Sequence, residues 1–123
     1  MGNPFVHVEL NTNDVDKAKS FFGSLLDWKL EDVPMGEMGT YTTIGVGGDD
    51  DVGGGIMQHP MPGAPSLWIP YAAVGDVRAV TDKARSLGAT VIRDVTEVPG
   101  MGSFTIISDP TGATLGLWQS SRQ

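Results

Sequence analysis

The sequence contains no cysteine and few basic residues. Without thiols the chain can form no disulfide, and it offers neither a thiolate nucleophile nor a cysteine-bound zinc site. Eight Lys and Arg residues stand against fifteen Asp and Glu residues, which gives a formal net charge of −7 at pH 7. An acidic chain without a basic cluster argues against binding to nucleic acid or to an anionic membrane surface.

Long apolar runs are absent as well. The N-terminus has neither a basic lead nor an apolar stretch, so we predict no signal peptide, no membrane span and a cytoplasmic location. The densest charge run, Asp49–Asp51, lacks the spaced ligands of a calcium loop and is interpreted as a solvated turn. With 123 residues, 40% of them hydrophobic, the chain is predicted to fold as a single domain over residues 1–123.

Residues 5–11 alternate between apolar and polar side chains. In a strand this alternation would place the apolar positions 6, 8 and 10 on one face and His7, Glu9 and Asn11 on the other. A helix predicted from about Asp14 to Trp28 would cover the apolar face with one stripe of side chains. The stripe consists of Val15, Ala18, Phe21, Phe22, Leu25 and Leu26. The functional site is therefore predicted on the polar face, away from this helix.

The same order of a strand, a helix and three strands is predicted twice. Module one covers about residues 4–58 and module two about 67–119, and the proline-rich segment 59–66 links them. The predicted strands are 5–11, 28–33, 40–46, 52–57, 67–74, 90–94, 103–108 and 114–119. The second helix would begin at Asp76, bury Val80, Ala84 and Leu87, and end at Gly88.

Matching segments support this internal repeat. They are Asp14-Val15 with Asp76-Val77, Met38–Tyr41 with Met101–Phe104, and Gly55–Met57 with Gly116–Trp118, at offsets of 62, 63 and 61 residues. Three nearly equal offsets along the chain indicate two copies of one module. Each module has a single helix for one face of its sheet, so a twin module or a ligand is needed on the other face.

This organisation resembles the vicinal oxygen chelate superfamily, which includes glyoxalase I, bleomycin-resistance proteins and extradiol dioxygenases. The motifs that carry the resemblance are His7–Asp14, Gly53–Met57 and Asp109–Ala113, and together with the repeat they cover essentially the whole chain. The resemblance implies an α+β fold of two tandem βαβββ modules. In such proteins curved mixed sheets surround a cup, and the helices lie outside.

Metal-dependent members of this superfamily place ligands on the first and last strands of each module. The matching positions here are His7, Gly55, Ile69 and Gly116, of which only His7 can ligate. A divalent metal normally takes at least three protein ligands, so we expect no family-type metal and assign no cofactor. A rearranged site of His7, Glu9 and His59 remains the alternative, and it would imply a metal-dependent lyase, isomerase or dioxygenase.

An apolar cup with a few convergent polar groups is typical of a small-molecule pocket. The predicted ligand-binding residues are His7, Glu9, Asn11, Met57, Tyr71 and Trp118. Ordinary core packing is the competing interpretation for Met57, Tyr71 and Trp118. The glycines at 53–55 indicate either a β-bulge or a closely approaching ligand.

The sequence thus predicts a glyoxalase-like or bleomycin-resistance-like protein that binds a small organic molecule. We expect a homodimer without nucleic-acid or membrane partners, and no catalytic residue is assigned. Metal-free acid–base chemistry by His7 and Glu9 is a further possibility. Whether one chain or two chains build the cup is left open by the sequence.

Overall fold

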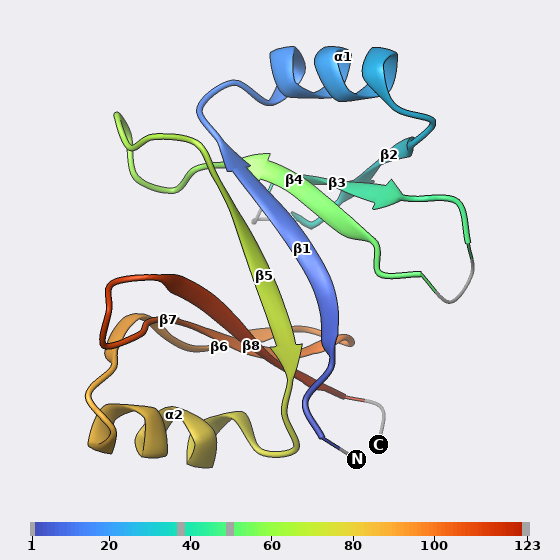
Figure 1. Cartoon of the computed structure of the whole chain (residues 1–123). Coiled ribbons are helices and arrows are strands. Elements are labelled where there is room, and N and C mark those ends of the chain that lie inside the picture. The colour runs from blue at the N-terminus through green and yellow to red at the C-terminus, as the bar shows by residue number, and fades with distance from the viewer. Residues whose placement is uncertain (1, 37–38, 49–50, 122–123) are drawn as a thin grey trace. The chain divides into compact units, whose positions relative to one another are not determined.

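The computed structural model describes residues 2–36, 39–48 and 51–121, which form two α-helices and eight β-strands (Figure 1). In chain order these are β1 (Phe5–Thr12), α1 (Val15–Leu25), β2 (Lys29–Pro34), β3 (Thr40–Gly45), β4 (Gly54–Gln58), β5 (Leu67–Ala73), α2 (Val77–Ser86), β6 (Thr90–Val98), β7 (Gly102–Ser108) and β8 (Thr114–Ser120). The order βαβββ occurs twice, so the predicted α+β class and the predicted pair of modules are confirmed.

The chain divides into two compact units. The first unit is residues 7–69, with strand order β2-β3-β4-β1, and the second unit is residues 1–6 with 70–123, with strand order β5-β8-β7-β6. In each unit the first and last strands of the module pair in parallel, and the other neighbours are antiparallel. The N-terminus joins the second unit because Ala73 N donates to Pro4 O at 2.9 Å and Asn3 Nδ2 donates to Ala73 O at 2.8 Å.

In the first unit, α1 covers one face of the sheet. Asp14 precedes the helix in an extended conformation, and its side chain accepts a hydrogen bond from Lys17 N at 3.0 Å. A short acceptor at this position satisfies one of the unpaired N–H groups of the first turn. The residues packed together beneath the helix are Leu10, Ile44 and Ile56 from the sheet with Val15, Ala18 and Phe22 from α1.

Part of the predicted helical stripe is not buried. The helix ends at Leu25, three residues before the predicted end at Trp28. Phe21 and Leu25 are 56% and 60% exposed, and Leu26 is 39% exposed. Trp28, which was predicted at the end of the helix and the start of the next strand, precedes β2 and stacks on Phe22 with ring centroids 5.7 Å apart. The face of α1 that packs on the sheet is thus narrower than its apolar face and only partly buried.

The second unit repeats the arrangement with a partly polar interior. Asp76 accepts a hydrogen bond from Ala79 N at 3.1 Å, and α2 packs on Ile107 and Leu117. Thr81 of the helix is buried, and its hydroxyl donates to Val77 O at 2.6 Å and contacts Thr105 Oγ1 at 3.0 Å.

At the end of α2 the sequence prediction was only partly correct. Gly88 has φ +102°, as expected for a glycine that ends a helix. Leu87 was predicted to be buried but is 68% exposed, because it stands at the C-cap after the last helical turn. Strand β6 runs to Val98, four residues beyond its predicted end.

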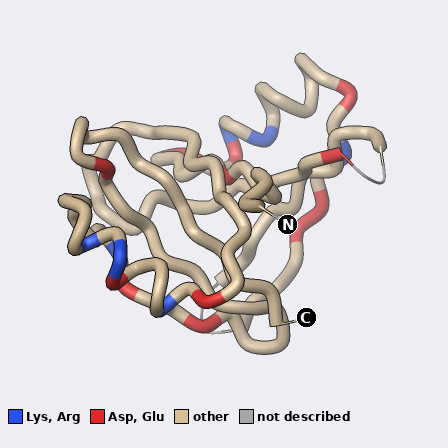
Figure 2. Tube along the Cα trace, turned by 60° about the horizontal axis from the view of Figure 1, so that its bottom comes forward, with Lys and Arg blue, Asp and Glu red and all other residues tan. Residues whose placement is uncertain are grey.

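Charge is distributed unevenly over the elements. Basic residues lie mainly on the two helices, whereas acidic residues are spread along the chain (Figure 2). Of the predicted acidic turn, Asp49 and Asp50 lie outside the described residues. Neither of the two helices in the described residues is long and apolar enough to cross a membrane.

Candidate functional site

The polar side chains of β1 lie on the sheet face opposite α1. Leu10 packs beneath the helix, and the alternation of the strand turns Glu9 and Asn11 to the other side. There Glu9 is paired in register with Gly55 of β4, and Asn11 with Met57. Glu9 and Asn11 are 8% and 4% exposed, and His7 is half-buried.

Tyr41 of β3 connects these groups into one hydrogen-bonded chain. Asn11 Nδ2 donates to Glu9 Oε2 at 2.8 Å, and the Tyr41 hydroxyl donates to Glu9 Oε1 at 3.0 Å. His7 Nε2 lies 2.7 Å from the Tyr41 hydroxyl oxygen. Because the Tyr41 proton is directed to Glu9, the imidazole donates from Nε2 and carries its hydrogen there. We refer to His7, Glu9, Asn11 and Tyr41 as the polar network.

The Tyr41 hydroxyl therefore bridges His7 and Glu9, the pair considered for acid–base chemistry. Tyr41 stands between them, and its ring lies almost end to end with the imidazole, at a centroid distance of 6.2 Å and an interplanar angle of 23°. Tyr41 was missing from the predicted site. The available signal was its alternation with Thr42, which is buried, so that Tyr41 must point to the opposite face.

Burial keeps the imidazole neutral. Desolvation lowers the pKa of His7 below its ordinary value of 6.5, and the negative charge of Glu9 opposes this shift without cancelling it. At pH 7 the neutral form of His7 is thus the stable one. A neutral imidazole beside a hydrogen-bonded carboxylate offers both donor and acceptor atoms on one sheet face.

Two tyrosines occupy the space beside the glycines that match family metal-ligand positions. A Cβ built on Gly55 would overlap the ring and hydroxyl of Tyr41, and a Cβ built on Gly116 would overlap the ring of Tyr71. The β4 ladder to β1 is continuous from Gly54 to Gln58, so Gly55 marks neither the bulge nor the ligand space proposed for it. With Ile69 unable to ligate, these positions do not fit the family's metal.

His59, the third member of the alternative metal site, lies at the far end of β1. Its backbone N–H donates to Thr12 O at 2.8 Å. Thr12 is five residues from His7 on β1, and at ~3.3 Å per residue this separation is about 16 Å. Its Nδ1 accepts a hydrogen bond from Met61 N at 3.0 Å. Within the described part of the chain no three His, Asp or Glu side chains are placed to share a metal. The rearranged site of His7, Glu9 and His59 is therefore not assembled.

Tyr71 and Trp118, the other two aromatic members of the predicted site, belong to the second unit. Tyr71 is 4% exposed and meets Phe104 edge-on, with centroids 6.2 Å apart. Trp118 is the cross-strand partner of Phe104, and its indole lies over Gly102. These side chains face away from α2, because Thr105 and Leu117, which alternate with them, pack toward that helix. We call Tyr71, Phe104 and Trp118 the aromatic wall.

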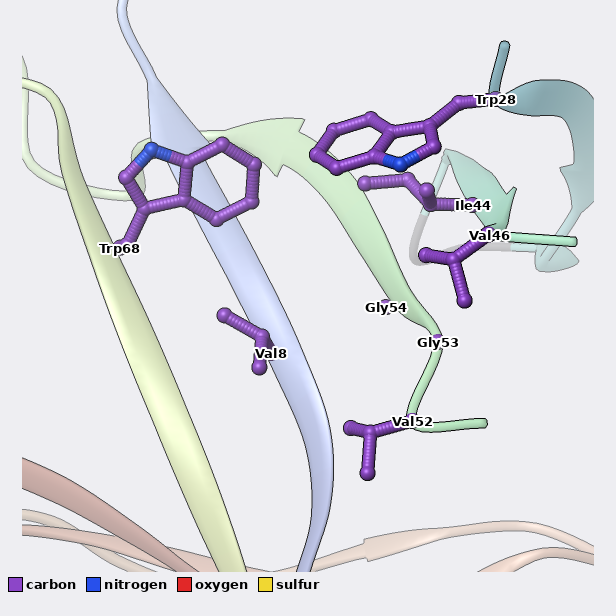
Figure 3. Close-up of a pocket in the computed structure, with 8 residues that line it drawn as sticks. All are labelled: Val8, Trp28, Ile44, Val46, Val52, Gly53, Gly54 and Trp68. Atoms are coloured by element: carbon purple, nitrogen blue, oxygen red, sulfur yellow. The ribbon is translucent and has the colours of Figure 1, made fainter. Parts of the chain in front are cut away.

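A separate apolar hollow of about 250 Å³ lies on the helix side of the first unit (Figure 3). It is lined by Val8, Trp28, Ile44, Val46, Val52, Gly53, Gly54 and Trp68. In Figure 3 the indoles of Trp28 and Trp68 enter it from two sides, and their centroids are 6.2 Å apart. None of the described residues that line it carries a titratable side chain. The candidate functional site is the opposite face, which carries the polar network.

Comparison with known proteins extends over nearly the whole chain. It is 38% identical to “Putative glyoxylase CFP32” of Mycobacterium tuberculosis (strain CDC 1551 / Oshkosh) over 117 residues, which are 94% of this chain and 45% of that protein. It is 28% identical to the anthracycline biosynthesis protein DnrV of Streptomyces peucetius, over 90% of this chain and 45% of that protein. The chain thus spans about half the length of these relatives.

Solved structures share the fold at low sequence identity. A methylmalonyl-CoA epimerase from Mycobacterium tuberculosis superposes with a TM-score of 0.68 at 14% identity, over 95% of this chain and 87% of that one. The hypothetical protein BH1468 from Bacillus halodurans C-125 gives 0.70 at 13% identity, over 100% and 98%. The family model described as Glyoxalase/Bleomycin resistance protein/Dioxygenase superfamily matches residues 5–117. The chain belongs to this superfamily.

Proposed function

We propose that the chain binds a small organic molecule at the polar network, without the metal used by other members of its superfamily. The observation that carries the proposal is the buried carboxylate of Glu9, held by hydrogen bonds from Tyr41 and Asn11. Removing a carboxylate from water costs several kcal/mol unless hydrogen bonds compensate. Apolar side chains would stabilise this face at lower cost, which favours a binding role over a packing role.

The polar network offers a ligand defined directions for hydrogen bonding. Tyr41 and Asn11 each bond one oxygen of Glu9, so the carboxylate cannot turn freely. His7 is neutral beside it, and Met57 adds a thioether next to Asn11 in register. An amphipathic ligand would place its polar edge on the network and its apolar part on Met57. That Tyr71 and Trp118 contribute stacking area to the same ligand remains a prediction.

The names of the relatives support an organic ligand. One relative is named as a glyoxylase and another for anthracycline biosynthesis, and both names refer to the chemistry of small organic molecules. Stacking of a planar ligand on Trp118 would contribute about 0.5–1.5 kcal/mol beyond the burial of apolar area. We therefore expect planar or amphipathic ligands to bind best.

A screen of small aromatic compounds and metabolites by ligand-observed NMR tests this proposal. Replacing Glu9 by Gln should weaken ligands that carry hydrogen-bond donors by about 1.5–3 kcal/mol and leave other ligands nearly unchanged. Glu31→Gln is the matched control, because Glu31 is exposed on β2 and its side chain lies outside the network. Trp118→Ala should weaken all ligands. No binders, or binders with hydrogen-bond donors that are indifferent to Glu9→Gln, would refute the proposal.

A second candidate function is metal-free proton transfer. The chain of imidazole, phenol and carboxylate is continuous, with links of 2.7 and 3.0 Å, and such chains can exchange a proton with a bound substrate. Ligands found in the screen would be incubated with the protein in D₂O and followed by proton NMR. Deuterium entering a carbon position, with loss of the effect in Glu9→Gln and Tyr41→Phe, would establish catalysis. Binding without exchange would leave the binding function alone.

We also infer a homodimer that uses α1. Phe21 and Leu25 form an exposed apolar surface on this helix, and Leu26 follows them. One copy of the chain spans 45% of the length of each relative, so the two copies in a dimer would together match about nine-tenths of it. Sedimentation analysis should give a dimer mass that Leu25→Glu converts to the monomer mass. Leu87→Glu, at an exposed leucine at the end of α2, should leave the dimer intact, and equal effects of the two changes would contradict this interface.

A further inference from the structure

We propose that Arg93 and the aromatic wall of the second unit form a recognition site for planar aromatic ligands that carry a carboxylate. The inference rests on the proposed function, in that it names the chemical class of the small molecule. It assigns a ligand-binding role to Arg93 and Phe104, which were not among the predicted site residues.

Arg93 is directed at the wall by irregularities in β6. Its guanidinium carbon lies 5.3 Å from the centroid of the Phe104 ring, which is within the range of a cation–π contact. In a regular strand residues 91, 93 and 95 would share a face, yet Val91 and Val95 pack with the core beneath α2. The pairing of β6 with β7 shifts register on both sides of Arg93. Such irregularities redirect side chains and are frequent next to binding sites.

The aromatic wall gives a ligand ring a place to stack. Phe104 of β7 meets Tyr71 of β5 edge-on and is the cross-strand partner of Trp118 of β8. Glycines at 102 and 116 leave the space that the Trp118 and Tyr71 rings occupy against the backbone. The half-buried rings of Phe104 and Trp118 are the part of the wall that a ligand can reach, since Tyr71 is only 4% exposed. Stacking on such surfaces is favourable for planar ligands.

The charge of Arg93 is not used elsewhere in the described residues. Lys19 is bonded to Asp32, and Arg85 to Asp82 and Asp94, at 2.9–3.0 Å, whereas no such ion pair is formed by Arg93 in residues 2–36, 39–48 and 51–121. Arg93 and Lys19 are also the basic residues of this part of the chain that are not classed as exposed.

Five of the seven described basic residues lie on α1 and α2, and only Lys29 and Arg93 lie on strands (Figure 2). Arg93 is therefore a local positive charge on an aromatic sheet face of a chain whose net charge is −7. A guanidinium can keep its flat face on Phe104 while its N–H edge binds a carboxylate with two parallel hydrogen bonds. A ligand with a carboxylate on a planar ring matches both groups.

The test compares 2-naphthoate with its neutral amide, 2-naphthamide, as ligands of the whole chain in NMR titrations. The two probes have the same rings and differ in charge. Naphthoate should bind about tenfold more tightly, which corresponds to one charge-assisted contact. In Arg93→Gln its affinity should fall to that of naphthamide, whose own binding should not change. Phe104→Leu should weaken both probes by the same factor.

Two further variants separate this site from general charge effects. Arg78→Gln removes the same charge from the exposed face of α2 and should leave the preference for naphthoate intact. Arg93→Lys keeps the charge but not the planar fork, so it should retain only part of the preference. Circular dichroism would verify that each variant is folded.

The outcomes distinguish this inference from the function on which it rests. Equal affinity for the two probes, or equal losses in Arg93→Gln and Arg78→Gln, would overturn the Arg93 site. If naphthamide binds in a manner sensitive to Glu9→Gln while neither probe responds to Arg93→Gln, the proposed function stands and this inference fails. If neither probe binds, both are refuted for aromatic ligands.

Discussion

The two units use one module for two kinds of surface. Their helix-facing sides are alike, since Ile56 and Leu117, at matching offsets, lie in aliphatic cores beneath α1 and α2. Their other sides differ. Glu9 of the first unit corresponds to Tyr71 of the second at an offset of 62 residues, so that a buried carboxylate stands where the twin has an aromatic ring.

This difference indicates that folding constrains the helix-facing side of each sheet more strongly than the opposite side. A helix must bury an apolar stripe on the sheet, so both helix-facing sides are constrained to mainly apolar packing. The opposite sides have no helix of their own to cover, and they carry hydrogen-bonding groups in one unit and aromatic groups with Arg93 in the other. The chemistry of the chain is thus concentrated on the sides that the helices leave free.

The largest effect should come from the shared core. Ile56→Ala and Leu117→Ala each remove buried aliphatic volume beneath a helix and should lower the free energy of unfolding by about 2–5 kcal/mol. Chemical denaturation of both variants would measure the losses. Similar losses would support equal roles for the two cores. A loss below 1 kcal/mol in one variant would mean that its helix contributes little to stability.

The glycines beneath the tyrosines should give the next effect. Gly55→Ala and Gly116→Ala would force Tyr41 or Tyr71 from its position, and overpacking of this kind costs about 1–3 kcal/mol of stability. Gly75→Ala is the control, since nothing lies within 4 Å of a Cβ built there. Thermal unfolding would compare the three variants. A Gly55→Ala protein as stable as the control would show that Tyr41 is not held over Gly55.

Within the polar network, the Tyr41 hydroxyl should contribute a comparable amount to stability. Tyr41→Phe removes the donor to Glu9 Oε1 and the acceptor for His7, and should cost about 1–3 kcal/mol of unfolding free energy. A double-mutant cycle with Glu9→Gln isolates the shared part. Additive losses would indicate that the two groups do not interact, and would reduce the network to separate contacts.

The smallest expected effect is a pH dependence from His7. Its pKa in the folded chain lies below the ordinary 6.5, so the unfolded chain binds more protons as pH falls. Stability is therefore full above pH 6.5 and declines as pH is lowered toward the folded-state pKa. In His7→Gln, urea midpoints measured at pH 7.5 and 5.5 should differ less than in the unchanged chain. An unchanged pH difference in the variant would assign it to other groups.

The sequence predicted those features of the two units that depend on local periodicity. Alternation in β1 placed Glu9 and Asn11 opposite Leu10, because successive residues of a strand must face opposite sides. Offsets between matching segments revealed the duplicated module. Helical spacing, in contrast, overestimated the buried stripe of α1, since an apolar residue such as Phe21 can stay exposed when no element covers it.

Contacts between distant strands could not be read from the sequence. The position of Tyr41 over Gly55 depends on the register of β3 against β4, which the sequence does not state. The hollow joins Trp28 to Trp68 across forty residues. Arg93 reaches Phe104 through register shifts in β6, and no glycine or proline within that strand announces them. Each missed feature is a tertiary contact between side chains far apart in the chain.

The packing of Tyr41 on Gly55 also bears on how this chain could acquire metal chemistry. A ligating side chain introduced at position 55 would collide with Tyr41, and removing Tyr41 alone would deprive Glu9 of a hydrogen bond and give no ligand in return. Each single substitution is thus expected to be harmful, while the two together could be tolerated. The same holds for position 116 and Tyr71. A directed-evolution path that introduces metal ligands at these two positions would have to change each of them together with its tyrosine.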